Sequence, residues 1–529
     1  MTFSATEHLP ASAANLVAAI TAGELTARDA VETHIARIES VNPRINAVTQ
    51  ATFEQARADA ERADALLARG EPTGPLHGVP VTVKDCFAVR GTETTLGIPG
   101  RSRGPADSDS PLVRRLRAAG AIVLGKTNVP QGMLIHECDN PLFGRTDHPL
   151  DAARSPGGSS GGEAAIVAAG GSMIGLGSDL GGSIRQPAAA CGVAGFKPTS
   201  LRLTTVGSDR AIAGMQAMPI APGPIARSVA DLDLAMRAML DPGSEPLRAD
   251  ERAMPWRDYR DLAVDRLRIA WWSDDGAIPV AAGVRRVLSE AASTLTDLGA
   301  DVRPVEPPAT EEMLAIYFGL ISADGMRCLA RAVGGQTVDQ QIAQQLRLAR
   351  VPRTMRRLLA GLLSAVGQRR TADLLRWSGP RSADEYWQLI AAAEDFRTHY
   401  WRRLDEAFSA AGSPAAPVDA VLSPPYGMPA LRHGSALHLV MAASHCFLAN
   451  LVDAPAGVVP FGEVREADER DELNRGRSRW AIGDRYATAN AVGSTGLPLA
   501  VQVMARPWRD EIALAALAAL EHARPAGVA

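Results

Sequence analysis

The sequence predicts an α/β protein with a mixed central β-sheet covered by helices on both faces. Short apolar segments that suit buried strands alternate with longer amphipathic segments that suit helices, which is the pattern of this fold class. Residues 267–272 form such a strand, and a helix over 280–298 and a strand over 300–302 follow it. Of the 529 residues, 46% are hydrophobic and 22% are charged, so the chain can bury a large core without disulfides or metals.

The first 75 residues are expected to be helical. Thr26 is a candidate N-cap for a helix whose apolar residues recur at helical spacing. Gly23 ends the helix before it, and Asn42-Pro43 is expected to end this one. Residues 51–69 are rich in Ala, Glu and Arg and predict one exposed helix.

The remaining elements fill the rest of the chain without a clean linker or repeat. Residues 154–196 are dense in Gly, Ser and Ala but contain apolar residues that Gly/Ser linkers lack, so this stretch is folded. Strands are expected over 78–83, 121–124, 420–422, 457–459 and 499–504, and helices over 111–119, 340–377 and 509–523. We therefore expect a single domain over 1–529, made of a helical region 1–75, a core 76–240, a cap over about 310–410 and a C-terminal part of the sheet over 415–529.

The charge and the cysteines exclude several classes of protein. A net charge of −4 argues against a nucleic-acid binder. Five widely spaced cysteines suit a reducing cytoplasm better than a disulfide framework. The sequence contains no uninterrupted run of 18 apolar residues, so we predict no transmembrane helix. We therefore expect a cytoplasmic protein.

Lysine is rare in this chain. Of the 55 basic residues only Lys84, Lys126 and Lys197 are lysine. Base composition of the gene explains the depletion but not which lysines remain. Arginine cannot lose its proton in a protein, whereas lysine can. The three positions therefore direct attention to residues 84–197 as a region where the titration of an amine matters.

Two Gly/Ser clusters carry the densest chemical signal. Residues 155–162 read Ser-Pro-Gly-Gly-Ser-Ser-Gly-Gly, and residues 179–185 read Asp-Leu-Gly-Gly-Ser-Ile-Arg. Glycine beside serine lets backbone N–H groups converge, and converging N–H groups can bind an oxyanion. Two tight turns packed on each other would give the same pattern, so the clusters alone leave both interpretations open.

A serine nucleophile needs a base. None of the ten histidines lies in either cluster, although a distant histidine could fold in. Residues 157–161 match the G-x-S-x-G elbow of Ser-His hydrolases, but that elbow needs a strand directly before it, and 153–156 is a poor strand end. Lys84 is the better candidate because it ends the apolar strand over 79–83, where loss of water lowers the pKa of an amine.

Taken together, these motifs resemble the amidase signature family. The motifs that carry the resemblance are residues 78–85 (Gly-Val-Pro-Val-Thr-Val-Lys-Asp), 157–162, 179–185, 223–228 (Gly-Pro-Ile-Ala-Arg-Ser) and 496–498 (Gly-Leu-Pro). The general likeness covers about 75–240 and 420–520. Shorter stretches, 128–131, 138–144, 455–460 and 499–508, resemble the branch of the family that hydrolyses fatty acid amides.

The resemblance implies a role for each matching position. Ser183 would be the nucleophile, Ser159, held by a cis peptide bond in this family, would relay protons, and Lys84 would be the base. Backbone N–H groups of Leu180, Gly181, Gly182 and Ser183 would form the oxyanion hole. Ser160, Asp179 and Arg185 would hold the loops in place.

Other chemistry-bearing residues are expected to be structural. Lys126 and Lys197 match family positions with structural roles. Residues 136–139 (His-Glu-Cys-Asp) lack the second spaced pair that a metal site needs, and Gly175-Leu176-Gly177 lacks the third glycine of a nucleotide fingerprint. We therefore expect no metal and no cofactor.

The substrate side is indicated by a basic helical region and one pocket candidate. Residues 340–372 contain no acidic residue, and arginines alternate with apolar residues over 346–370. Such a helix can lie on an anionic membrane or can pack in a core or a homodimer contact, and the sequence leaves both open. By resemblance, Met133 and Leu134 would line the pocket for the acyl group.

We therefore expect a serine hydrolase that cleaves the C–N bond of a lipophilic carboxylic amide to acid and amine, through an acyl-enzyme on Ser183. An aryl-amide, anilide or carbamate hydrolase with the same three residues is the first alternative. The amidase component of a tRNA-dependent amidotransferase is the second, and a non-catalytic homologue or a Ser-His esterase would be other classes.

Overall fold

Two structural units account for the described residues of the computed structural model, which are 10–71, 73–243, 246–307, 309–410, 417–475 and 481–524. The first unit consists of Met1–Asp179, Ser183–Arg210 and Ile220–Trp256. The second consists of Leu180–Gly182, Ala211–Pro219 and Arg257–Ala529. The expectation of a single domain stays a prediction.

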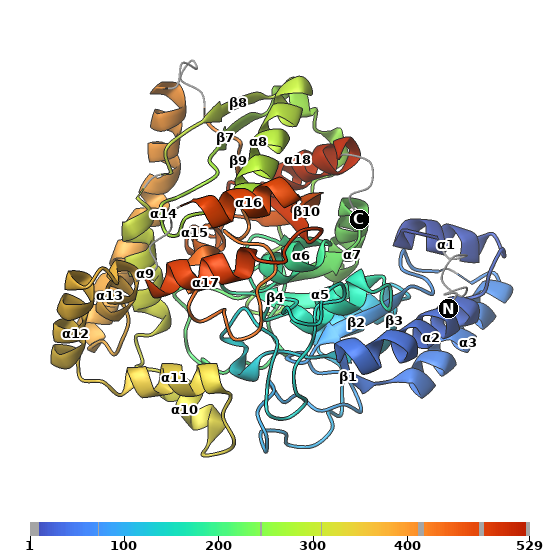
Figure 1. Cartoon of the computed structure of the whole chain (residues 1–529). Coiled ribbons are helices and arrows are strands. Elements are labelled where there is room, and N and C mark those ends of the chain that lie inside the picture. The colour runs from blue at the N-terminus through green and yellow to red at the C-terminus, as the bar shows by residue number, and fades with distance from the viewer. Residues whose placement is uncertain are drawn as a thin grey trace. The chain divides into compact units, whose positions relative to one another are not determined.

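The strands of the first unit lie in the order β1-β3-β2-β4-β6-β5. Figure 1 labels β1 to β4 of this unit. Parallel pairs join β3, β2 and β4, whereas β1 pairs with β3, and β6 pairs with β4 and β5, in the antiparallel sense. Their bounds are Val48–Ala51 (β1), Pro80–Lys84 (β2), Ile122–Thr127 (β3), Ile174–Asp179 (β4), Ala194–Lys197 (β5) and Ala221–Ala226 (β6). Every residue of β2, β3 and β4 is buried, so the centre of this sheet lies in the core.

The helices of the first unit pack on this sheet. Helix α5 contacts β2, β4 and β6, α2 contacts β2 and β3, and α7 contacts β4, β5 and β6. The bounds are Ala13–Thr21 (α1), Ala27–Ile45 (α2), Phe53–Ala68 (α3), Pro111–Ala118 (α4), Gly161–Ala168 (α5), Arg185–Cys191 (α6) and Val229–Leu240 (α7), with a 3₁₀ turn at Gln131–Met133 (η1).

The start and end of α2 test two of the sequence expectations. Thr26 caps the helix as predicted, because its side chain accepts the N–H of Asp29 while the Asp29 carboxylate accepts the N–H of Thr26. The predicted stop at Asn42-Pro43 is wrong. Pro43 lies in the last turn, where its missing N–H removes one helical bond, and the helix ends at the left-handed Asn46 instead.

The N-terminal region also contains a strand that was not predicted. Residues 48–51 form β1 on the edge of the sheet, so the helix expected over 51–69 begins at Phe53. That helix is exposed on one side and buries Ala56, Ala60 and Ala63 on the other.

The strands of the second unit lie in the order β10-β11-β9-β7-β8. Antiparallel pairs join β10 to β11 and β11 to β9, and parallel pairs join β9 to β7 and β7 to β8. Their bounds are Arg268–Trp271 (β7), Asp301–Pro304 (β8), Ala420–Ser423 (β9), Ala456–Glu463 (β10) and Pro498–Ala505 (β11). The predicted strand–helix–strand order over 267–302 is confirmed.

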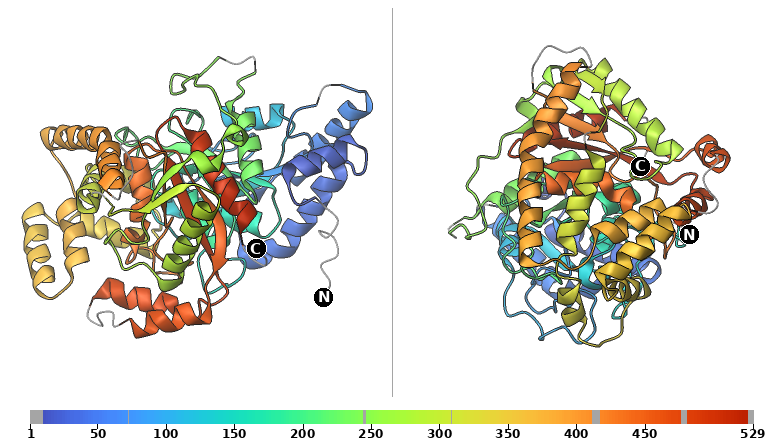
Figure 2. Two further views of the ribbon diagram at one scale, coloured as in Figure 1. Left: turned by 90° about the horizontal axis from the view of Figure 1, so that it is seen from above. Right: turned by 90° about the vertical axis from the view of Figure 1, so that its left-hand side faces the viewer.

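Helices α8 and α18 pack on the strands of the second unit, and α14 runs beside α9 (Figure 2, right). The bounds are Ala282–Asp297 (α8), Thr310–Ile321 (α9), Arg327–Val333 (α10), Gln340–Ala349 (α11), Arg353–Ala365 (α12), Arg369–Trp377 (α13), Ala383–Ala410 (α14), Ser444–Leu451 (α15), Glu466–Asn474 (α16), Ile482–Ala491 (α17) and Asp510–Ala523 (α18), with 3₁₀ turns at Tyr259–Asp261 (η2), Val264–Arg266 (η3) and Val440–Ala443 (η4). None of the described helices is both long and apolar enough to span a bilayer. The predicted mixed α/β fold class is confirmed.

Candidate active site

Lys84 ends the central strand β2 with its side chain fully buried. Residues two apart in a strand point to the same face, so Lys84 lies on the face of Thr82, toward α5. Its Nζ lies 2.8 Å from Ser159 Oγ, 3.1 Å from Ser178 Oγ and 3.3 Å from the Ser178 carbonyl oxygen. The predicted pair of Lys84 and Ser159 is therefore in direct contact.

Burial sets the charge preference of this amine. Loss of water lowers the pKa of Lys84, and this effect outweighs the opposing influence of Cys86, Asp179, Cys138 and Glu163. A lowered pKa increases the fraction of neutral amine near neutral pH. Lys84 thus has the position and the titration direction that a base requires.

The loop before α5 presents Ser159. The peptide bond between Gly158 and Ser159 is cis, and the Gly158 N–H donates to Gln186 Oε1 at 2.9 Å. Gly158 must be glycine because a Cβ there would lie 2.7 Å from the Ile135 carbonyl oxygen. The chain segment that follows Met133 and Leu134 therefore passes directly beside Gly158.

Ser160 joins the two Gly/Ser clusters. Its backbone N–H donates to the carbonyl oxygen of Ser183 at 3.0 Å. Both serines are buried, and Ser183 is 9% exposed. The two Gly/Ser clusters are therefore in direct contact, which a proton transfer between Ser183 and Ser159 would need.

A buried ion pair fixes the segment that carries Ser183. Arg185 donates to both carboxylate oxygens of Asp179 at 3.0 Å, and both side chains are fully buried. Asp179 also accepts the Ile184 N–H at 3.1 Å. Asp179 and Arg185 therefore join the two ends of the loop over 180–184. Their role in supporting the site stays a prediction.

Gly181 leaves room for two aromatic rings that belong, like Gly181 itself, to the second unit. A Cβ on Gly181 would overlap the Tyr317 hydroxyl and lie 3.2 Å from the Phe447 ring. Tyr317 stacks on Phe447 with ring centroids 4.1 Å apart, and Phe318 packs on both rings edge to face. Sequence reasoning missed these rings, because nothing in the local pattern of α9 or α15 relates them to a loop so distant in the chain.

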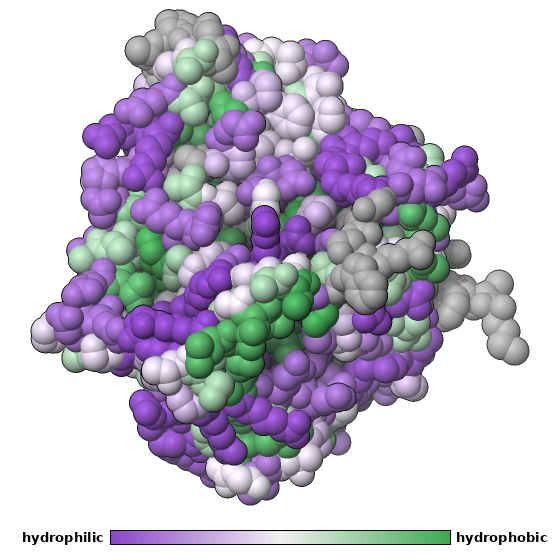
Figure 3. Space-filling model, turned by 60° about the vertical axis from the view of Figure 1, so that its left-hand side comes forward, coloured by the Kyte–Doolittle hydropathy of each residue, from purple (hydrophilic) through white to green (hydrophobic). Residues whose placement is uncertain are grey.

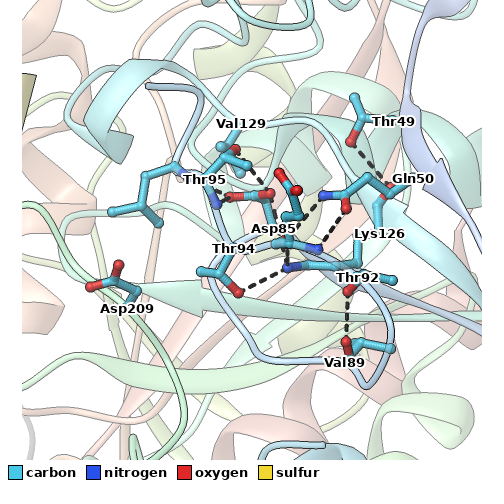
Figure 4. Close-up of polar contacts among 12 residues, drawn as sticks. Thr49, Gln50, Asp85, Val89, Thr92, Thr94, Thr95, Lys126, Val129 and Asp209 are labelled. Carbon is cyan, nitrogen blue, oxygen red and sulfur yellow. Dashed lines mark hydrogen bonds and ion pairs between the residues drawn. The ribbon is translucent and has the colours of Figure 1, made fainter. Parts of the chain in front are cut away.

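The second lysine, Lys126, belongs to a structural cluster beside the site. Its buried Nζ donates to the Glu93 carbonyl oxygen at 2.5 Å and to Thr94 Oγ1 at 3.1 Å, and lies 4.0 Å from Asp85 Oδ1 (Figure 4). Asp85, the residue after Lys84, accepts the backbone N–H groups of Thr95 and Leu96. The cluster anchors the chain directly after the catalytic candidate.

The third lysine, Lys197, ends β5 and is also fully buried. Its Nζ donates to the Pro198 carbonyl oxygen at 3.1 Å. All three lysines of the chain are therefore buried, and Lys84 contacts Ser159 of the first Gly/Ser cluster.

Two contacts on the lysine face were not predicted. Ser178 on β4 makes two of the three polar contacts of the amine, and Glu163 on α5 influences its titration. The alternation of side chains along β4 could have indicated which face of the sheet Ser178 lies on, but not that it contacts Lys84.

Met133 and Leu134 are half-exposed on the loop beside Gly158, and their role in a pocket stays a prediction.

The metal-ligand types at 136–139 do not form a cluster. Among the described residues, no group of three or more His, Cys, Asp or Glu side chains is arranged to hold a metal ion. Cys138 is buried, and its Sγ contacts Thr146 Oγ1 at 3.4 Å.

Comparison with known proteins agrees with this fold. The family model described as Amidase matches residues 29–514. Fatty-acid amide hydrolase 1 of Sus scrofa is 35% identical over 503 residues, which are 94% of this chain and 83% of that protein. A glutamyl-tRNA(Gln) amidotransferase subunit of Synechococcus sp. (strain WH7803) is 33% identical over 451 residues, 83% of this chain and 88% of that protein.

A solved structure of fatty acid amide hydrolase shares the fold with a TM-score of 0.82 at 24% identity, covering 99% of this chain and 86% of that one. Fold and relatives together define an enzyme that hydrolyses amides. The chain belongs to the amidase signature family, as its motifs predicted.

Proposed function

We propose that this enzyme hydrolyses the C–N bond of a lipophilic carboxylic amide through an acyl-enzyme on Ser183. The observation that carries the proposal is the 2.8 Å contact between the buried Lys84 Nζ and Ser159 Oγ. A neutral amine has two protons and one lone pair. The amine can donate its two protons to the hydroxyl and carbonyl oxygens of Ser178. Its lone pair then remains free to accept the proton of Ser159.

The proton transfers follow from this arrangement. Ser183 Oγ attacks the amide carbon, its proton passes to Ser159 Oγ, and the proton of Ser159 passes to Lys84 Nζ. The tetrahedral intermediate then expels the amine as the same relay returns the proton to the leaving nitrogen. Water cleaves the acyl-enzyme by the same transfers, so the residues return to their starting state with acid and amine released.

The negative oxygen of the intermediate needs hydrogen-bond donors. The backbone N–H groups of Leu180, Gly181, Gly182 and Ser183 are the proposed donors, because the two glycines let the backbone approach the substrate closely. The Asp179–Arg185 ion pair supports this loop. Loss of one such donor typically costs about 2.7–4 kcal/mol in the transition state.

Several observations favour a lipophilic substrate. The relative from Sus scrofa is named as a fatty-acid amide hydrolase. The buried rings of Tyr317, Phe318 and Phe447 form an apolar cluster beside Gly181. Met133 and Leu134 are the proposed acyl-pocket residues on the loop beside Gly158.

The test is kcat/KM over primary amides from acetamide to oleamide, with acetanilide included and Ser183→Ala as the blank. A rise with chain length that the variant abolishes supports the proposal. A flat profile with strong acetanilide cleavage would move the substrate to aryl amides. No turnover by the purified chain alone would favour the amidase component of a tRNA-dependent amidotransferase, in line with the Synechococcus relative.

We propose further that helix α12 contacts a membrane surface. Met355, Leu358, Leu359, Leu362 and Val366 recur at helical spacing and are all exposed, with Leu358 at 65% and Leu362 at 66%. The buried face of α12 instead carries Arg356 and Ala360. Figure 3 shows a hydrophobic strip bordered by hydrophilic surface on the side of the molecule that carries these helices.

The charges beside this strip favour an anionic lipid surface over a second copy of the chain. Arg350, Arg357 and Arg369 are exposed near the strip, and residues 340–372 include no acidic side chain. A like-charged second copy would bring these arginines together, whereas an anionic bilayer would pair with them.

Co-sedimentation with phosphatidylserine-containing and neutral vesicles tests this contact. The double variant Leu358→Ser/Leu362→Ser should lose binding, and Leu473→Ser, which changes an exposed leucine of α16, should retain it. A dimer that the double variant converts to a monomer, without vesicle binding by the wild type, would assign the strip to a homodimer.

A further inference from the structure

Glu163 is a buried carboxyl group whose partners carry no charge. It is the third residue of α5 and is fully buried. Its Oε2 lies 2.6 Å from Thr82 Oγ1, and its Oε1 lies 2.7 Å from Thr127 Oγ1. Burying an ionised carboxylate without a cationic partner is costly, so this arrangement needs an explanation.

The position of this carboxyl group relates it to Lys84. Thr82 precedes Lys84 by two residues on the same face of β2, and Thr127 is the direct neighbour of Lys84 in the parallel pair of β2 and β3. On β4, Gly175 leaves the necessary space, because a Cβ there would overlap Glu163 Oε2. Glu163 therefore bridges β2 and β3 at the end of the strand that carries the base.

The hydrogen bonds around Thr82 indicate where the protons lie. Ser172 donates its hydroxyl proton to the Ile174 carbonyl oxygen at 2.9 Å, so its oxygen can accept from Thr82 at 3.2 Å. If Thr82 donates its single proton to Ser172, its oxygen can accept a proton from Glu163. An ionised Glu163 could only accept a hydrogen bond, so Thr82 would donate its single hydroxyl proton to Glu163. No proton would then remain for a hydrogen bond between Thr82 and Ser172. A protonated carboxyl group thus satisfies every contact in this chain.

We propose that Glu163 is a positioning residue that holds Lys84 in place through Thr82 and Thr127, and that it remains protonated in the resting enzyme so that the amine stays uncharged. A negative charge here would favour the ammonium form of Lys84, which cannot accept a proton. The inference rests on the proposed role of Lys84 as the base.

The surrounding titratable groups are consistent with a neutral Glu163. Burial raises the pKa of Glu163 to about 8, against the hydrogen bond that Thr127 donates and the charge of Lys84, which lower it. The ionisable groups that influence Lys84 are Cys86 on the chain after β2, Cys138, Asp179 and Glu163. Asp179 is compensated by Arg185, and burial raises the pKa of both cysteines.

Infrared spectroscopy tests the protonation state without any substrate. Compared with Glu163→Gln at pH 6, the wild type should show the additional carbonyl stretch of a protonated carboxylic acid, which should vanish as the pH rises through about 8. No such difference band would overturn the proposal. Because this readout needs no turnover, it stands or fails separately from the proposed amide hydrolysis.

Kinetics of two variants test the positioning role. Glu163→Gln keeps the shape and a donor for Thr82, so its kcat should stay within about threefold of wild type at pH 7. Glu163→Asp is too short to reach both threonines, so its kcat should fall at least tenfold with KM unchanged. A kcat equal to wild type in Glu163→Asp, or a hundredfold loss in a folded Glu163→Gln, would overturn the proposal.

Discussion

The backbone N–H of Ser160 donates a hydrogen bond to the carbonyl oxygen of Ser183 at 3.0 Å. This bond ties the residue after Ser159 to the proposed nucleophile, although the two serines belong to different loops. On the other side of Ser159, the Gly158 N–H is held by Gln186. The proposed relay of Lys84, Ser159 and Ser183 would therefore depend on backbone contacts between the two loops as much as on the three side chains.

Substitution of Lys84 should separate amides from activated esters. Lys84→Ala is expected to lower amide kcat/KM by about 10²–10⁴-fold, because both the base and the acid for the amine are lost. A labile ester needs no protonation of its leaving group and should retain more activity. The check is the ratio of amide to ester kcat/KM in each variant.

Lys84→Arg is the matched control for charge and size. Arginine cannot deprotonate, so this variant should be as defective on amides as Lys84→Ala. Equal losses on amide and ester in Lys84→Ala would contradict the role of Lys84 in protonating the leaving amine.

The pH dependence of the reaction should reflect the lowered pKa of Lys84. The amine must be neutral to accept a proton, so kcat/KM should rise with pH as Lys84 loses its proton, at a pH below its ordinary value of 10.5. In the same interval the unfolded chain binds more protons than the folded one, so this group adds stability as the pH rises. A pH–rate profile of the wild type tests this, and a rate that falls with rising pH through neutrality would contradict it.

The Asp179–Arg185 pair should be important for stability. Arg185→Ala leaves a buried carboxylate without its partner and is expected to cost about 3–5 kcal/mol in the free energy of unfolding. Arg69→Ala, which removes an exposed partner of Glu71, should cost only about 0–1 kcal/mol. Thermal or denaturant unfolding of both variants makes the comparison, and equal small effects would show that the buried pair is dispensable.

The loop at Gly181 should not tolerate a side chain. A methyl group there would overlap the Tyr317 hydroxyl, so Gly181→Ala should displace the backbone and lower kcat by about 10²-fold or more. The double variant Gly181→Ala/Tyr317→Phe removes the overlapping oxygen and should recover part of the activity. Gly361→Ala on α12, where a Cβ meets nothing within 4 Å, is the control that should leave turnover unchanged.

Much of the site could be predicted because its residues lie in short local motifs. Lys84 ends a strand that is apolar except for Thr82, and that pattern indicated burial and a lowered pKa. The Gly/Ser clusters indicated close approach of backbone to backbone, which the positions of Gly158 and Gly162 show. The strands β7 and β8 and the helix between them followed from hydrophobic periodicity.

The parts that could not be predicted depend on contacts between distant segments. Tyr317 and Phe447 approach Gly181, and Thr82 and Thr127 approach Glu163, only because of the tertiary fold. Edge strand β1 is short and half-exposed, so it has little periodicity to detect. Pro43 is tolerated in α2 because it lies in the last turn, where one missing hydrogen bond costs little.

The central claim is that Ser183 is the nucleophile, and covalent labelling tests it most directly. After reaction with a fluorophosphonate, peptide mass spectrometry should locate one phosphonyl group on Ser183. The label should be absent from Ser183→Ala, and amide turnover should fall in proportion to labelling. A label on another residue, or full amide hydrolysis by Ser183→Ala, would contradict the account.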